Sequence, residues 1–269
     1  MRPLPAWLAG LCAAAALLAQ VGCTTTTTTT SDGSVVPNPA ANAADPERRA
    51  QARLELAGLY FGRGQNQIAL DEIRQALLAR PDMPEAVGLR ALVQAAMGDS
   101  AGAEASFQRA MQLSPGDAGL VHNHGWFLCN ERRWADAEAA FDRAIAVPRY
   151  DGVARSWMAK GACQARAGRW TEAERSLSRS YELDPTSPVT AFNLAEVLLR
   201  RGELQRARFY VGRINAVAEQ VNAQSLWLAA RIERRLGDTA ALQDYGRKLR
   251  DRFPQAPETL RFERGRFED

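Results

Sequence analysis

The chain has 269 residues, enough to bury a sizeable core, and 46% of them are hydrophobic while only 7% are aromatic. This composition is rich in Ala, Leu, Arg and Glu and favours helices. Its 34 basic and 31 acidic residues leave a net charge of +3, which is too balanced and too dispersed for a nucleic-acid groove, so we expect no nucleic-acid partner.

The first 22 residues have the pattern of a secretory signal peptide. Arg2 precedes an apolar stretch over residues 6–21, which is shorter than the ~20 residues that cross a bilayer as a helix, so a permanent transmembrane anchor is the weaker interpretation. The stretch ends in Val21-Gly22-Cys23, which resembles the lipobox of bacterial lipoproteins, although Gln20 replaces the usual leucine. The resemblance implies a lipid on Cys23; the alternative is a free thiol beside an ordinary cleavage site.

Residues 23–46 are predicted to form a disordered tether that begins at the lipidated cysteine. Seven consecutive threonines are followed by Ser, Gly, Pro, Asn and Ala, which offer too little apolar surface to offset the entropy of ordering. Thr24 is not the aspartate that retains many lipoproteins in the inner membrane. We therefore expect a protein that is lipid-anchored at the periplasmic face of the outer membrane.

From Ala50 onward the same residue types recur with a period of about 34 residues, the length of a tetratricopeptide (TPR) unit. The first helix of each unit carries a small residue, namely Ala57, Ala91, Gly125, Gly161, Ala195 and Ala230. Five of the six units have a turn glycine, at Gly64, Gly98, Gly168, Gly202 and Gly237. Five of the six units end in a proline, at Pro81, Pro115, Pro148, Pro185 and Pro254, with Pro148 one position early.

This pattern predicts an all-α protein, a right-handed α-solenoid of about six TPR repeats within a domain over residues 47–257, followed by a C-terminal tail over 258–269. Small residues let paired helices approach closely. Each pair leaves an apolar face uncovered, so neighbouring pairs stack and create an extended concave surface that binds proteins. The repeats are expected near 50–83, 84–117, 118–151, 154–187, 188–221 and 223–256.

Trp126 lies in a column of the repeat that tends to face the concave surface, and His122 lies in the same helix. We predict that His122, Asn123 and Trp126 contact a protein partner, with simple burial as the alternative. Trp134 and Trp170 occupy one column of successive repeats just after the turn, so we expect them to pack inside the repeats.

Cys129 and Cys163 are the two cysteines of the predicted repeat domain, in the first helices of adjacent repeats. An oxidising compartment such as the periplasm would permit a disulfide between them. Two buried thiols are the alternative, because free cysteine usually behaves as a small apolar side chain.

We predict no catalytic, cofactor-binding or metal-binding residues and no small-molecule substrate. Gly98–Gly102 matches the G-x-S-x-G pattern around Ser100, but that motif requires a strand before a helix, and here it falls in a turn between helices. His122 and His124 are two residues apart and point to different faces of a helix, unlike the four-residue spacing that shares a metal. An enzyme acting through Ser100 is the competing hypothesis.

The sequence contains the string Asn123–Cys129, the segment Pro148–Tyr150 with an insertion after it, and the string Gly161–Cys163. Together these features resemble the PilW/PilF family, the TPR lipoproteins of type IV pilus biogenesis and stability. The resemblance covers nearly the whole mature chain. It implies a pilotin, a lipoprotein that binds secretin subunits and helps them reach or assemble in the outer membrane, and it implies a Cys129–Cys163 disulfide. The alternative is a general periplasmic TPR adaptor that recruits envelope or peptidoglycan enzymes.

Overall fold

The computed structural model describes residues 45–267. The predicted signal peptide, the lipidation site Cys23 and the tether up to residue 44 lie outside the described residues. The helices are α2 (Pro46–Gly62), α3 (Asn66–Ala79), α4 (Pro84–Ala96), α5 (Ser100–Leu113), α6 (Ala118–Asn130), α7 (Trp134–Ile145), α8 (Val153–Arg166), α9 (Trp170–Leu183), α10 (Pro188–Arg200), α11 (Leu204–Asn215), α12 (Ala223–Leu236), α13 (Thr239–Arg252) and α14 (Pro257–Glu263).

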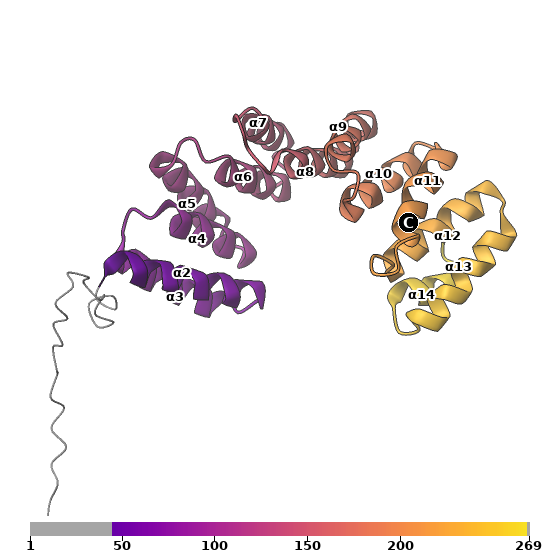
Figure 1. The fold of residues 1–269 in the computed structure, drawn as a ribbon, viewed down its shortest axis with the longest axis horizontal. Helices are drawn as coiled ribbons and strands as arrows, with labels where there is room; N and C mark the ends of the chain where they lie inside the picture. Colours follow the sequence, from indigo (N-terminus) through magenta and orange to yellow (C-terminus); the bar gives the residue numbers. More distant parts are fainter. Residues whose placement is uncertain (1–44, 268–269) are drawn as a thin grey trace, which may run out of the picture. The chain divides into compact units, whose positions relative to one another are not determined.

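The helices form six successive hairpins, from α2/α3 to α12/α13, and this arrangement confirms the predicted TPR α-solenoid (Figure 1). The first helices of neighbouring hairpins touch one another, from α2 and α4 through to α10 and α12, whereas the second helices of neighbouring hairpins do not. The first helices therefore line the inner face of the stack, and the second helices cover its outer face.

Helix starts and turns follow local chemistry. Side-chain oxygens at six N-caps accept a backbone N–H of the first turn, and these caps are Asp45, Asp99, Asp117, Ser187, Asn222 and Asp238. The five predicted turn glycines have positive φ, between 71° and 80°, a conformation that glycine adopts without a Cβ clash. The third repeat has Arg132 at this position with φ 59°, so its turn carries the strain that glycine avoids elsewhere.

Close approach between paired helices explains the small residue in the first helix. A Cβ at Gly161 would lie 2.6 Å from Leu177 Cγ and 3.1 Å from the backbone oxygen of Ala173. Any side chain at this position would push α8 and α9 apart. This close approach explains why the fourth repeat has glycine in a column that holds alanine in four of the six repeats.

Two large apolar clusters run through neighbouring repeats. The first joins α4 through α8 around the fully buried Phe107 and Phe141, and the second joins α8 through α12 around Leu194 and Leu198. Because both clusters include residues of α8, the third, fourth and fifth repeats share a continuous core. This core holds the first helices of these repeats in place.

The predicted C-terminal tail is partly helical. Within residues 258–269, which were expected to extend beyond the domain, α14 packs on both α12 and α13. Phe262 covers Gly246, where a Cβ would lie 2.2 Å from its ring, and the Phe267 ring stacks on Trp227 with centroids 4.9 Å apart. The segment caps the sixth repeat because its aromatic side chains cover apolar surface of α12 and α13.

Candidate functional site

The inner face carries a hollow of about 440 Å³ between the third, fourth and fifth repeats. It is formed where α6, α8 and α10 lie side by side, with the start of α9 at its edge. The lining residues are Trp126, Ala162, Ala165, Arg166, Trp170, Asn193, Glu196, Val197 and Arg200. The two alanines are small, and the large apolar walls of the hollow come from the tryptophans.

Two tryptophans at the hollow are partly open to solvent. Trp126 is 38% exposed and Trp170 is 37% exposed, although aromatic side chains of this size are usually covered in a solenoid core. The expectation of packing is therefore wrong for Trp170, which lines the hollow. Trp134, at the matching position one repeat earlier, is half-buried against the cluster around α6 and α7, as expected.

Arg166 at the end of α8 forms the charged edge of the hollow. Its Nη1 donates to Asn130 Oδ1 at 2.7 Å, and its guanidinium carbon lies 5.9 Å from the ring centroid of Trp126 and 6.0 Å from that of Trp134. The side chain is thus oriented by a hydrogen bond to a neutral amide oxygen and by cation–π attraction. The hollow thus combines apolar walls with an oriented positive charge.

The structure separates the three residues predicted to contact a partner. Trp126 is exposed and Asn123 is half-buried, but His122 is only 7% exposed and its Nδ1 lies 2.8 Å from Ser156 Oγ. Tyr150, from the segment between the third and fourth repeats, reaches the same Ser156 hydroxyl at 3.4 Å. His122 therefore belongs to a buried polar cluster between α6 and α8 and offers no surface to a partner.

Burial and the positive charge of Arg155 lower the pKa of His122 from 6.5 to about 4. Burial also lowers the pKa of His124, against the opposing effect of Glu104. Histidines with a lowered folded-state pKa bind fewer protons than in the unfolded chain, so stability decreases as pH falls from 6.5 towards 4. We expect a loss of the order of 2 kcal/mol across this window, measured by urea unfolding at several pH values.

The control for this pH dependence is the His122→Gln variant, whose amide can still bond to Ser156. Carboxylates titrate alike in both proteins, so the difference between the two pH profiles isolates the histidine. A variant profile as steep as that of the natural chain would contradict the assignment to His122.

Cys129 of α6 and Cys163 of α8 are paired as a disulfide, with Cα atoms 5.8 Å apart. This separation is common among protein disulfides. Both residues are fully buried, and the pair joins the two helices that carry Trp126 and Arg166. The bridge therefore lies directly beside the hollow.

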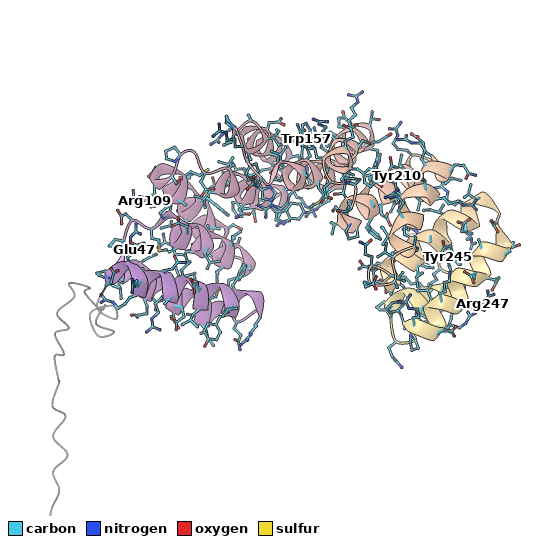
Figure 2. All side chains as sticks on the ribbon, viewed as in Figure 1. Glu47, Arg109, Trp157, Tyr210, Tyr245 and Arg247 are labelled. Carbon is cyan, nitrogen blue, oxygen red and sulfur yellow. A yellow bond between two sulfur atoms is a disulfide. The ribbon has the colours of Figure 1, made fainter. Side chains whose placement is uncertain are left out.

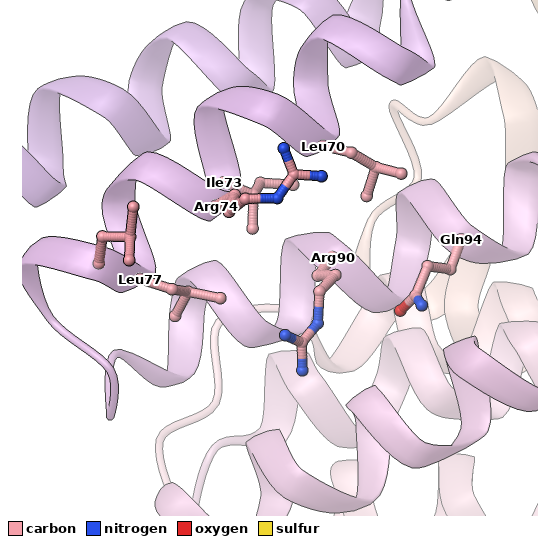
Figure 3. A pocket seen from close by; sticks show the side chains of 7 residues that line it. Leu70, Ile73, Arg74, Leu77, Arg90 and Gln94 are labelled. Carbon is pink, nitrogen blue, oxygen red and sulfur yellow. The ribbon is translucent and has the colours of Figure 1, made fainter.

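A second apolar hollow of about 340 Å³ lies between α3 and α4 (Figure 3). Leucine and isoleucine side chains of α3 form one wall, and Leu78 beside them is 71% exposed. The polar side chains of α4 are engaged within the second repeat, since Arg90 Nε donates to Ser106 Oγ at 3.0 Å and that hydroxyl donates to Gln94 Oε1 at 2.6 Å. This hollow is thus apolar without an aromatic wall.

Ser100 does not have the surroundings of a hydrolase nucleophile. It is the first residue of α5, after the turn at Gly98, and its hydroxyl donates to Glu131 Oε1 at 2.9 Å. Within residues 45–267 no three His, Cys, Asp or Glu side chains gather closely enough to hold a metal ion. No helix in this range is long and apolar enough to cross a membrane.

Comparisons with known proteins agree with this architecture. Family models of the tetratricopeptide repeat match residues 54–118, 128–188 and 164–231. Type IV pilus assembly protein PilF of Pseudomonas aeruginosa is 25% identical over 226 residues, which cover 84% of this chain and 89% of that protein.

Two solved structures extend the comparison. The crystal structure of PilW, a type IV pilus biogenesis factor, is 30% identical with a TM-score of 0.71, and the match covers 78% of this chain and 96% of that chain. The structure of Pseudomonas aeruginosa PilF has a TM-score of 0.68 at 23% identity, over 82% of this chain and 99% of that chain. The second likeness shows the shared fold.

Proposed function

The chain belongs to the family of tetratricopeptide-repeat proteins of type IV pilus biogenesis that includes PilW and PilF, and we propose that it acts as a pilotin. In this role it binds secretin subunits and assists their localisation and assembly in the outer membrane. The observation that supports the proposal is the hollow of the inner face, which the partly exposed side chains of Trp126 and Trp170 line. Aromatic side chains in such hollows supply much of the energy of protein interfaces.

The proposal includes attachment to the membrane through Cys23. A lipid on this cysteine and the threonine-rich tether would hold the repeat domain at the periplasmic face of the outer membrane. Mass spectrometry of the purified protein should then detect a diacylglycerol-modified Cys23. An unmodified N-terminus, or an uncleaved signal peptide, would contradict the anchor.

No reaction forms part of the proposal. TPR scaffolds generally bind other proteins, and the residues that line the hollow include no Ser, Cys or His that could act as a nucleophile or a general base.

We also propose that the Cys129–Cys163 disulfide forms in the periplasm, where oxidising conditions favour it.

Removing the gene should eliminate surface pili and heat-resistant secretin multimers, and the natural chain should restore both. Electron microscopy and immunoblotting of membranes measure these outcomes. Intact multimers and pili in the deletion strain would overturn the pilotin role and favour the alternative, a general periplasmic adaptor.

Trp126→Ala should weaken binding to the periplasmic part of the secretin by about 2 kcal/mol, roughly 30-fold in Kd, because a half-exposed tryptophan in a hollow is a typical anchor. Isothermal titration calorimetry measures the change. Leu78→Ala, in the hollow between α3 and α4, is the matched control and should bind normally. If Leu78→Ala abolishes binding while Trp126→Ala does not, the partner uses the first repeat and the inner hollow is excluded.

A further inference from the structure

We infer that the inner hollow binds a partner segment in which a bulky apolar side chain lies beside a carboxylate. The apolar side chain enters between Trp126 and Trp170, and the carboxylate binds Arg166. This inference rests on the proposed function, because it names the chemistry of the protein segment that the same hollow would take.

The apolar half of the inference follows from the walls of the hollow. Trp126 and Trp170 line the hollow and are both partly exposed, and the neighbouring lining residues Ala162 and Ala165 are small. The volume of about 440 Å³ falls among those of small-ligand pockets, ~300–1,000 Å³. An aromatic or long aliphatic side chain fits this space and would remove exposed apolar surface of both tryptophans from water.

The charged half follows from the partners of Arg166. Its hydrogen bonds, to Asn130 Oδ1 at 2.7 Å and to Cys129 Sγ at 3.8 Å, both start from Nη1. No carboxylate among residues 45–267 forms an ion pair with it. The Nε and Nη2 donors are therefore left for a ligand, and an arginine fork presents them in the geometry that accepts a carboxylate.

The charges of the surrounding helices favour an anionic ligand. The sequence of α6 has no Asp, Glu, Lys or Arg, and α8 carries Arg155, Lys160 and Arg166 but no acidic residue. The one acidic side chain of the hollow, Glu196, is paired with Arg231 of α12 at 2.9 Å. Lys160 is paired with Asp142 of α7, so Arg166 is the cation of α8 that lines the hollow. A cation without an acidic partner attracts acidic segments and disfavours basic ones.

A random heptapeptide library displayed on phage and selected on the mature protein tests this chemistry. Enriched peptides should contain Phe, Trp, Leu or Met next to Asp or Glu. On Arg166→Gln, which keeps a donor for Asn130 but removes the charge, the acidic preference should disappear while the apolar preference stays. Arg166→Lys keeps the charge and should keep the acidic preference.

Two further variants complete the design. Trp126→Ala should lose the apolar preference. Arg109→Gln removes the same charge from an exposed position on α5 (Figure 2) and should select the same peptides as the natural chain. A synthetic peptide of the enriched sequence should bind Arg166→Gln about tenfold more weakly than it binds the natural chain.

Each contrary result overturns the inference. Selection of peptides without acidic residues, an acidic preference that persists in Arg166→Gln, or no enrichment above background would each exclude the assigned chemistry. The pilotin role is judged separately by the pili and secretin multimers of the deletion strain. A normal deletion phenotype together with acidic peptides selected as described would contradict the proposed function and leave the chemistry of the hollow intact.

Discussion

Phe141→Ala is expected to destabilise the protein by about 3 to 5 kcal/mol, the range for truncating a fully buried aromatic side chain. Phe141 of α7 is 0% exposed and lies in the cluster that joins α4 through α8. Its ring fills the space above Gly125, where a Cβ would lie 3.0 Å from it, and its centroid is 5.6 Å from that of His122. The cavity left by alanine would therefore open between α6 and α7.

Urea unfolding followed by circular dichroism measures this loss. Phe209→Ala is the matched control, because it removes the same ring from another second helix, α11, where the side chain is 56% exposed. The control should cost less than about 1 kcal/mol. Equal losses in the two variants would show that burial in this cluster does not carry the stability.

The unfolding curve of Phe141→Ala should also broaden. In a solenoid each repeat contacts only its neighbours, so a weakened third repeat lowers the coupling between the two ends of the stack. Tryptophan fluorescence and circular dichroism would then report different midpoints. Coincident midpoints would show that the stack still unfolds as one unit.

The repeat architecture could be predicted from the sequence because its determinants are local. A small residue at Gly161 and a glycine turn at Gly168 specify one helix hairpin within a few residues of each other, and the recurrence of both specifies the stack. The structure confirms the stack of helix hairpins. It also places Trp126 on the inner face, as its column in the repeat predicted.

The details that could not be predicted depend on neighbouring repeats. His122 occupies an inner-face column, but Ser156 of the next repeat bonds to its ring and Tyr150 reaches the same hydroxyl. Trp170 lies at the same column as Trp134, yet it lines the hollow together with residues of α6, α8 and α10. A single-repeat alignment contains no information on these contacts between helices distant in sequence.

Some features of the sequence indicate the C-terminal helix, although they lie outside the repeat pattern. Pro257 is suited to a helix start, and Phe262 and Phe267 are apolar side chains that a solvated tail would leave exposed. The period ends before them, so the alignment assigns them to no repeat. In the structure they cover the last hairpin, which is the capping that the end of a solenoid requires.

Reduction of the Cys129–Cys163 disulfide is expected to lower the free energy of unfolding by roughly 3 to 4 kcal/mol. The bridge spans a sequence separation of 34 residues. For a loop of this length, the lost chain entropy of the unfolded state corresponds to this decrease in the free energy of unfolding. Urea unfolding with and without a thiol reductant measures it. The Cys129→Ala/Cys163→Ala variant should show a similar loss and no response to the reductant, so a change in this variant would reveal an effect of the reductant elsewhere.

The loss of stability upon reduction should be concentrated in α6 and α8. The disulfide fastens α6 to α8, so amide hydrogen exchange should accelerate in these two helices upon reduction and change little in α12, which lies two repeats beyond α8. Because α6 and α8 also carry Trp126 and Arg166, their loosening should weaken partner binding at the hollow as well. If reduction accelerates exchange equally in α12, or leaves binding unchanged, the bridge does not organise the hollow.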